Sequence, residues 1–282
     1  MISQIMDCTA NRHVLVCDLD GTLYTSTGSI TNNAIKVIKS FLRNNGIFII
    51  ATGRHYNEVK NLLKVFDYNK NFYLITSDGQ YVYNNLAMII YKSDYLSKMI
   101  CFDIKNFLSG YRSIMFVHDN FDILVYPNQL QKILAIAYCY IKGKTTTRKR
   151  NFLYVDEVKQ DILGKIEKIR IYKSKRWNEF ENNVLQKIEI YTMTYKDYID
   201  IYSMQTTKAN ALTYILEMLM LPINNVVVIG NDDNDLSLFA MISNSYCVAN
   251  GSITALKTAK YTVPDNDNNG VIEAILRAKL IM

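Results

Sequence analysis

Short apolar runs rich in β-branched residues alternate, over the first part of the chain, with longer stretches whose apolar residues recur at helical spacing. Runs of this kind predict buried strands, and the stretches between them predict helices with one apolar face. In order, the predicted elements are a strand over 13–19, a helix from Thr31 or Asn32 to Gly46, a strand over 47–52, a helix over 56–66 and a strand over 72–76. Strands and helices that alternate with short connections predict an α/β fold, with a parallel sheet covered on both faces.

The same alternation returns in the closing third of the chain. Its predicted elements are a helix over 206–220, a strand over 226–230, a helix over 234–243, a strand over 246–249 and helices over 252–260 and 270–280. The two ends of the chain therefore predict one Rossmann-like core, built from residues 1–80 and 200–282.

The middle of the chain follows a different pattern. Apolar runs on either side of Asn84-Asn85 and of Asp119-Asn120 predict two hairpins, over 81–91 and 113–126. The other predicted elements are a helix over 128–141, a strand over 166–172, a helix over 175–188 and strands between 189 and 203. Hairpins mixed with helices predict an α+β domain, residues 81–199, inserted into the α/β core.

Composition indicates how large the folded cores can be and in which environment the protein works. With 282 residues, of which 49% are hydrophobic, the chain can bury the cores of one large or two smaller domains. Its five cysteines are scattered and lack Cys-x-x-Cys spacing, which favours a reduced, cytoplasmic protein without structural zinc. No apolar run approaches the roughly 18 residues of a membrane span, and residues 1–11 include acidic and polar groups where a signal peptide is apolar. We therefore expect a protein that is not exported and has no membrane partner.

Positive charge gathers in the predicted insertion. Residues 81–199 carry 19 Lys and Arg against 12 Asp and Glu, while the whole chain has a net charge of +6. The densest stretch, Lys142 to Arg150, is either a solvated basic loop or a surface that attracts anions. Because no RNA-binding aromatic signature accompanies it, we expect no nucleic-acid partner.

Candidate chemistry begins where the first predicted strand ends. Asp18 and Asp20 follow this apolar run, and Gly21 lets the chain turn so that both carboxylates crowd one site. Two carboxylates in one pocket repel each other unless a shared proton or a cation such as Mg²⁺ relieves them. One acid can then act as a nucleophile while the other moves a proton, although an Asp-Gly pair is also common in plain turns.

Four stretches together resemble the motifs of the haloacid dehalogenase (HAD) superfamily, in its Cof-like branch. In the order of that family they are Asp18-Leu19-Asp20-Gly21-Thr22, Ile50-Ala51-Thr52-Gly53-Arg54, Lys208-Ala209-Asn210 and Gly230-Asn231-Asp232-Asp233-Asn234-Asp235. Each match is weak alone, but four in the right order are a strong signal. The resemblance covers nearly the whole chain, is weakest over 100–190, and implies a HAD fold whose inserted domain is a type IIB cap that selects the substrate.

The resemblance also implies an activity and a set of site residues. It implies a Mg²⁺-dependent phosphohydrolase that acts on small phosphorylated metabolites, such as sugar phosphates, through an aspartyl-phosphate. Asp18 would be the nucleophile, Asp20 the general acid and then base, Thr52 a phosphoryl ligand and Lys208 the fixed cation. The implied substrate-binding residues are Gly53, Arg54, Asp78, Asn234 and Asn266, and the implied metal ligands are Asp18, Asp20 (through its main-chain carbonyl), Asn231 and Asp235.

Three positions depart from the family pattern. Asn231 stands where Asp is usual, so the site loses a negative charge and metal affinity should fall unless Asp232 or Asp235 substitutes. Asp78 stands where Asn is usual, which alters contact with the substrate. Ala209 replaces a usual Gly, a mild change on a helix.

Other functions stay open beside the phosphatase. A phosphomutase shares these motifs, and Asn231 supports a weakly active or inactive protein that binds a ligand or regulates. A calcium hand is rejected, because the loop that starts at Asp265 has Leu276 in the twelfth position, where a bidentate Glu is required. The sequence predicts no particular substrate and no oligomeric state.

Overall fold

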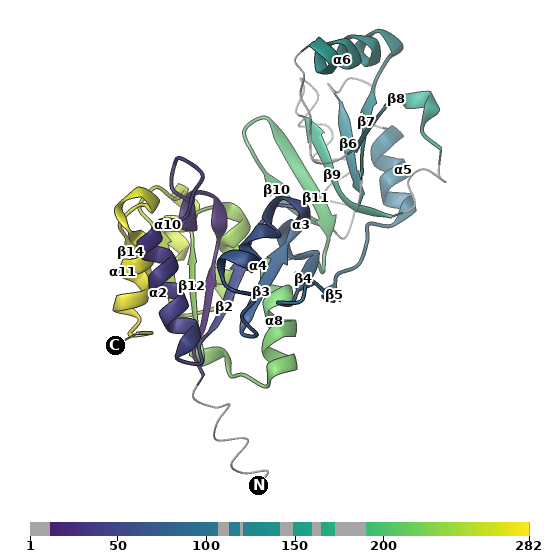
Figure 1. Ribbon diagram of the computed structural model, residues 1–282. Helices are drawn as coiled ribbons and strands as arrows, with labels where there is room; N and C mark the ends of the chain where they lie inside the picture. The colour runs from purple at the N-terminus through teal and green to yellow at the C-terminus, as the bar shows by residue number, and fades with distance from the viewer. Residues whose placement is uncertain are drawn as a thin grey trace. The chain divides into compact units, whose positions relative to one another are not determined.

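The computed structural model describes residues 12–106, 113–118, 121–141, 149–159, 165–172 and 190–281. The chain divides into two compact units, one of Met1–Ser93 with Thr207–Met282 and the other of Asp94–Thr206 (Figure 1). Each unit has its own sheet and its own hydrophobic core.

The first unit is built on an eight-stranded sheet with the strand order β14-β13-β12-β1-β2-β3-β4-β5. Its strands are β1 (Val14–Cys17), β2 (Ile47–Ala51), β3 (Phe72–Thr76), β4 (Tyr81–Tyr83), β5 (Ile89–Lys92), β12 (Val226–Gly230), β13 (Ser245–Val248) and β14 (Tyr261–Val263). Neighbours from β14 to β3 are parallel, and the hairpin of β4 and β5 continues the sheet in antiparallel fashion. Since β1 lies between β12 and β2, its carboxyl end is flanked by the ends of two parallel neighbours.

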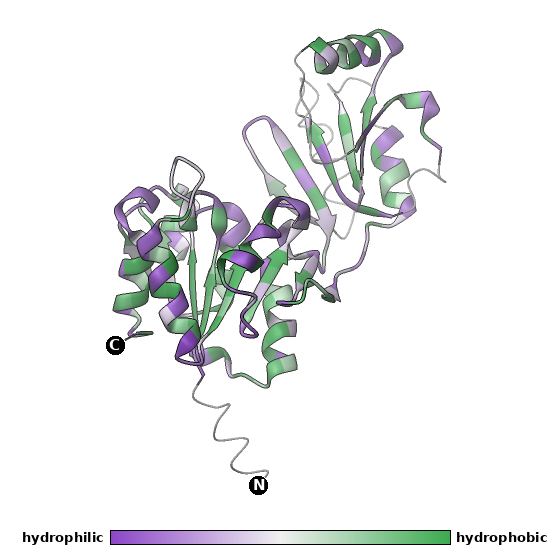
Figure 2. Cartoon of the chain, in the orientation of Figure 1, coloured by the Kyte–Doolittle hydropathy of each residue, from purple (hydrophilic) through white to green (hydrophobic). Residues whose placement is uncertain are grey.

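Helices cover both faces of this sheet (Figure 1). One face carries α2 (Asn32–Arg43), α3 (Tyr56–Val59), α4 (Asn61–Val65) and α11 (Gly270–Arg277), and the other carries α8 (Lys208–Leu219), α9 (Leu236–Met241) and α10 (Ile253–Thr258). Leu15 and Cys17 of β1 belong to the first core, while Val14 and Val16 belong to the second. Figure 2 shows the resulting apolar strands between two amphipathic layers. The predicted α/β fold with a parallel sheet is confirmed.

Capping side chains fix where the helices begin. Thr31 accepts a hydrogen bond from the N–H of Ala34 at the start of α2, and Thr207 accepts one from Asn210 at the start of α8. The helix predicted over 56–66 is instead two short helices, α3 and α4, joined at Lys60. The Thr207 cap matters most for the site, because it places Lys208 in the first turn of α8.

The second unit is built on a six-stranded sheet with the order β10-β11-β9-β6-β7-β8, in which only β7 and β8 are parallel among the described strands. Its elements are α5 (Lys98–Asn106), β6 (Ile114–His118), β7 (Phe121–Tyr126), α6 (Gln129–Ile141), β8 (Lys149–Tyr154), β9 (Ile166–Tyr172), β10 (Ile190–Thr194) and β11 (Tyr198–Ser203). Phe116, Ile169 and Ile201 from the sheet pack with Cys101 and Ile104 of α5 in one apolar core.

The structure differs from the predictions in several places. We expected domain boundaries at 81 and 199, whereas the compact units divide after Ser93 and after Thr206, because the hairpin of β4 and β5 pairs with β3. The elements α5, β8 and β14 were not predicted. The helix predicted over 175–188, the turn at Asp119-Asn120 and most of the basic stretch that starts at Lys142 lie outside the described residues. Within the described ranges, no helix has the length and apolarity needed to cross a membrane.

Candidate active site

Neighbouring parallel strands deliver polar side chains to one edge of the first unit's sheet. Asp18 follows β1 directly, Thr52 follows β2 and Asn231 follows β12. The N–H of Asp18 donates to the carbonyl of Ile229 (2.9 Å), and that of Thr52 donates to Ile75 (2.9 Å), so the ladder continues to the site itself. Carboxyl ends of parallel strands are where open α/β sheets place their ligands, so this edge is the candidate active site.

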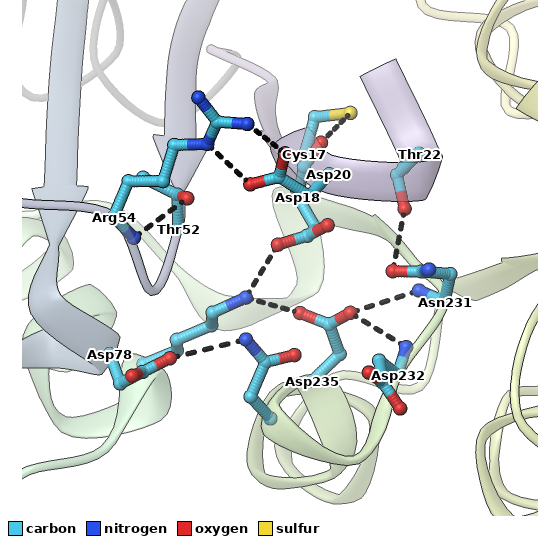
Figure 3. A network of polar contacts seen from close by, with 12 residues as sticks. Cys17, Asp18, Asp20, Thr22, Thr52, Arg54, Asp78, Asn231, Asp232 and Asp235 are labelled. Carbon is cyan, nitrogen blue, oxygen red and sulfur yellow. Dashed lines mark hydrogen bonds and ion pairs between the residues drawn. The ribbon is translucent and has the colours of Figure 1, made fainter. Parts of the chain in front are cut away.

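A buried ammonium group lies between two carboxylates at the centre of this edge (Figure 3). Nζ of Lys208 is 2.7 Å from Oδ1 of Asp18 and 2.7 Å from Oδ1 of Asp235. All three side chains are buried, and the lysine and Asp235 are fully so. Three residues therefore share one desolvated ionic contact: one directly after β1, one at the start of α8 and one in the loop after β12.

The charges in this contact do not balance. Burial raises the pKa of Asp18 to about 7, and the neighbouring Asp235 adds to the rise, while attraction to Lys208 opposes it. Burial alone would lower the pKa of Lys208, but the carboxylates of Asp18 and Asp235 outweigh it and raise the lysine's pKa. The lysine thus stays protonated, and the carboxylate of Asp18 is left short of positive charge.

The loop after β12 folds around the carboxylate of Asp235. Its Oδ2 accepts hydrogen bonds from the N–H groups of Asn231 (2.9 Å) and Asp232 (3.2 Å), while Oδ1 binds Lys208. A Cβ on Gly230 would lie 2.5 Å from this Oδ2, so only glycine allows so close an approach. These contacts tie Lys208 to the loop after β12, and the role of Asp235 as a metal ligand stays a prediction.

Asp20 is bound by Arg54. Nε and Nη2 of Arg54 donate to the two carboxylate oxygens of Asp20 at 2.8 Å and 2.5 Å, in a fork-like pair. The guanidinium group also lies 5.4 Å from the centre of the Tyr24 ring. The hydrogen bonds to Asp20 raise the pKa of Arg54. Gly21, with φ of +73°, turns the chain directly after Asp20.

The loops after β2 and β3 are tied together beside the lysine. Oγ1 of Thr52 accepts from the N–H of Arg54 (3.1 Å), and the Thr52 carbonyl accepts from the N–H of Asp78 (3.1 Å). Nδ2 of Asn234 donates to Oδ1 of Asp78 (3.1 Å), and a Cβ on Gly53 would lie 2.7 Å from the same oxygen. The predicted substrate-binding residues at 53, 54, 78 and 234 therefore lie around one point.

Asn231 and Asn266 contact the segment that follows Asp20. Oδ1 of Asn231 accepts from Oγ1 of Thr22 (3.1 Å). Nδ2 of Asn266 donates to the carbonyl of Tyr24 (2.8 Å), and its N–H donates to Oδ1 of Asn250 (3.2 Å). No role was predicted for Thr22, Tyr24 or Asn250. Thr22 lies in the first of the four motif-like stretches, whereas Tyr24 and Asn250 lie in none of them.

Oxygen donors dominate the site. Among the described residues, no group of three or more His, Cys, Asp or Glu is already arranged to hold a metal. The carboxylate of Asp18, the carbonyl of Asp20 and the amide oxygen of Asn231 are nevertheless hard donors at the same sheet edge, beside an excess of negative charge. This chemistry fits Mg²⁺, which takes few protein ligands and keeps several waters.

Comparisons with known proteins indicate the family and the fold. A family model for haloacid dehalogenase-like hydrolases matches residues 15–275. A protein of Buchnera aphidicola subsp. Baizongia pistaciae, named "Putative phosphatase", is 27% identical over 254 residues, which are 87% of this chain and 89% of that protein. The structure of a HAD subclass IIB sugar phosphatase matches with a TM-score of 0.73 at 18% identity, over 95% of this chain and 100% of that one. A phosphatase of the same superfamily from Bacteroides thetaiotaomicron matches with a TM-score of 0.76 at 16% identity, over 95% and 96%.

Proposed function

Because the chain belongs to the haloacid dehalogenase-like hydrolase family, we propose that it is a Mg²⁺-dependent phosphatase of small phosphorylated metabolites, such as sugar phosphates. Membership confirms the predicted family and the predicted class of enzyme. The observation that carries the proposal is the buried contact of Lys208 with Asp18 and Asp235, at the carboxyl ends of parallel strands. Phosphate-monoester hydrolysis is so slow without a catalyst that a nucleophile and fixed positive charge are needed together.

Asp18 is the proposed nucleophile. Its Oδ1 binds Lys208, and its other carboxylate oxygen attacks phosphorus. The bond from phosphorus to the ester oxygen breaks, and an aspartyl-phosphate forms. Water then attacks this phosphorus, the bond to Asp18 breaks, and inorganic phosphate leaves. Lys208 compensates the charge that gathers on the phosphoryl oxygens.

Asp20 is the proposed proton donor and acceptor. In its protonated form Asp20 gives its proton to the departing ester oxygen, and the carboxylate so formed takes a proton from the water that attacks the intermediate. In the structure its carboxylate is paired with Arg54. A phosphate ester that enters beside Arg54 competes for the guanidinium group, and Asp20 then becomes available for proton transfer.

The remaining site residues bind the substrate and the metal in this proposal. The phosphoryl oxygens are held by Thr52, by Arg54 and by the N–H groups near Gly53. The other proposed substrate ligands are the side chains of Asp78, Asn234 and Asn266. Asp18, the carbonyl of Asp20 and Asn231 would hold Mg²⁺. When bound, the ion supplies charge that offsets the phosphoryl group and the crowded carboxylates.

The second unit is the proposed substrate-selecting cap. One structural relative is described as a sugar phosphatase, which supports the same substrate class here. The net positive charge of residues 81–199, which overlap most of this unit, favours anionic substrates over neutral ones. Asn231 gives one reason to keep the second candidate, a binding or regulatory protein on the same fold, because the site has one carboxylate fewer than the family pattern.

Phosphate release from a panel of phosphorylated metabolites, with millimolar Mg²⁺, tests the proposal. We expect turnover in the native protein and a loss of at least about 1,000-fold in Asp18→Asn, because an amide is not a nucleophile for phosphorus. Asp67→Asn is the matched control, since Asp67 is an exposed acid paired with Lys39 on the surface. Product analysis separates a hydrolase from a mutase. Equal turnover in Asp18→Asn and the native protein would overturn the mechanism, and an inert native protein would favour the binding protein.

A further inference from the structure

Asn231 is a neutral side chain fixed in an acidic site. Its N–H donates to Asp235 (2.9 Å), its carbonyl accepts from the N–H of Ser252 (2.8 Å), and its Oδ1 accepts from Thr22 (3.1 Å). Both the backbone and the side chain are therefore held in place. The folded loop therefore determines where the amide oxygen of Asn231 lies.

The acids that follow Asn231 in the chain make other contacts in the structure. Both carboxylate oxygens of Asp235 already accept hydrogen bonds, from Lys208 and from two backbone N–H groups. Asp232 uses its Oδ1 to accept from the N–H of Asp233 (2.8 Å) and so caps the short helix that follows. Asp233 accepts from the hydroxyl of Ser252 (2.9 Å), and Asp20 is paired with Arg54. Asp18 binds Lys208 through its Oδ1 alone, so its second oxygen can face a cation, with Asn231 supplying a dipole.

We propose that Asn231 keeps this a low-affinity cation site, which fills and empties as the concentration of free Mg²⁺ changes. The inference rests on the proposed function and adds a form of regulation to it. Affinity for hard cations rises with the number of charged ligands, and Mg²⁺ gives up its waters reluctantly. A site with one carboxylate and two neutral oxygens therefore binds the ion weakly, and turnover follows the supply of the ion.

The structure offers a substitution that changes charge and almost nothing else. Aspartate has the shape of asparagine, and Thr22 can donate to a carboxylate oxygen as it donates to the amide oxygen. Because residue 21 is a glycine, there is room beside residue 231: a Cβ on Gly21 would lie 2.6 Å from Nδ2 of Asn231. Asn231→Asp thus adds one negative charge at a fixed place.

The test is calorimetric titration of Mg²⁺ into metal-stripped protein without substrate, for the native chain and Asn231→Asp. We expect Asn231→Asp to bind Mg²⁺ about 10- to 100-fold more tightly. Asn224→Asp is the matched control, because Asn224 is exposed before β12, at the opposite end of that strand from Asn231, and should leave the affinity unchanged. Equal affinities in the native protein and Asn231→Asp would overturn the inference, as would an Asn231→Asp protein that binds no Mg²⁺.

Phosphate release by the same proteins separates this inference from the proposed function. A native protein that hydrolyses metabolites, while Asn231→Asp binds Mg²⁺ no more tightly, overturns the inference and leaves the phosphatase standing. Tighter binding in Asn231→Asp, with no turnover by either protein, overturns the phosphatase and supports the inference. Turnover that needs less Mg²⁺ in Asn231→Asp supports both.

Discussion

Asp18 is the less stabilised of the two carboxylates that share Lys208. Besides Lys208, Asp235 accepts hydrogen bonds from two backbone N–H groups, those of Asn231 and Asp232, whereas Asp18 accepts one, from Leu19. One ammonium group cannot neutralise two buried carboxylates, so one of them gains a proton more easily. Burial is the main reason why the pKa of Asp18 rises to about 7, and the charge of Asp235 adds to it, so a cation beside Asp18 would stabilise its charged form.

The metal-free protein should lose stability as the pH rises from about 4 to about 7. The folded state holds the Asp18 proton more tightly than the unfolded state, because burial raises the pKa of Asp18 from its ordinary value of 3.8 to about 7. Unfolding therefore becomes easier as the pH passes through this range. Asp18→Asn has no such proton, so its melting temperature in EDTA should be higher than that of the native protein at pH 8, by about 3 °C or more. Identical pH profiles for the two proteins would contradict this.

The residues that end the strands could be predicted, but their pairing could not. The order of apolar run, acid and glycine marks Asp18, and the spacing of the four motifs marks Lys208. Nothing in the sequence indicates that Arg54 forms an ion pair with Asp20 or that Asp235 binds Lys208, because these pairs join segments far apart in the chain. Such pairing depends on the angle at which each loop leaves the sheet.

At the scale of elements, the turn after β3 sets the position of α8. The short helix Ser77–Gly79 packs on the first turn of α8, and Gly79 has a φ of +105°. A Cβ on Gly79 would lie 2.2 Å from the carbonyl oxygen of Thr207, the residue that caps α8. The backbone at Gly79 is therefore in close contact with the segment that carries Lys208.

Gly79→Ala should be strongly destabilising, and Gly28→Ala is its matched control. Both glycines have positive φ, but a Cβ at Gly28, where φ is +75°, meets nothing within 4 Å. Gly28→Ala should therefore lower the free energy of unfolding by about 1 kcal/mol, which is the cost of a left-handed backbone for alanine. Gly79→Ala should lower it by about 3 kcal/mol or more, because the start of α8 must move. Urea unfolding measures both. Similar losses in the two variants would refute the steric argument.

The elements that the sequence failed to predict have weak local signals. β8 pairs with β7 alone, at the edge of the sheet, and its run Lys-Arg-Asn-Phe-Leu-Tyr does not alternate, while β14 has only three residues. The hairpin of β4 and β5 was predicted, but its place in the first sheet was not. A hairpin specifies its own register, and only tertiary packing decides which sheet it extends.

At the scale of the molecule, each unit has its own core and its own buried ion cluster. In the second unit, Arg170 donates to both carboxylate oxygens of Asp200 at 2.7 Å, and Lys168 approaches the same group at 3.3 Å. Burial alone would raise the pKa of Asp200, but attraction to Lys168 and Arg170 outweighs it and lowers the pKa. This cluster therefore stabilises the second unit at neutral pH and weakens as the solution becomes acidic.

Separate cores predict separate effects of breaking each cluster. Lys208→Met leaves two buried carboxylates without their cation in the first unit, and Asp200→Asn removes the shared anion in the second. Each should cost its own unit about 3–5 kcal/mol, and the two losses should add to within about 0.5 kcal/mol in the double variant. Hydrogen exchange locates the effects, since Lys208→Met should expose amides of β1 and β12, and Asp200→Asn those of β9 and β11. Lys36→Met, at an exposed position of α2, should change neither set. Equal increases of hydrogen exchange in both sheets for either single variant would contradict this prediction. The two units would then unfold together, despite their separate cores.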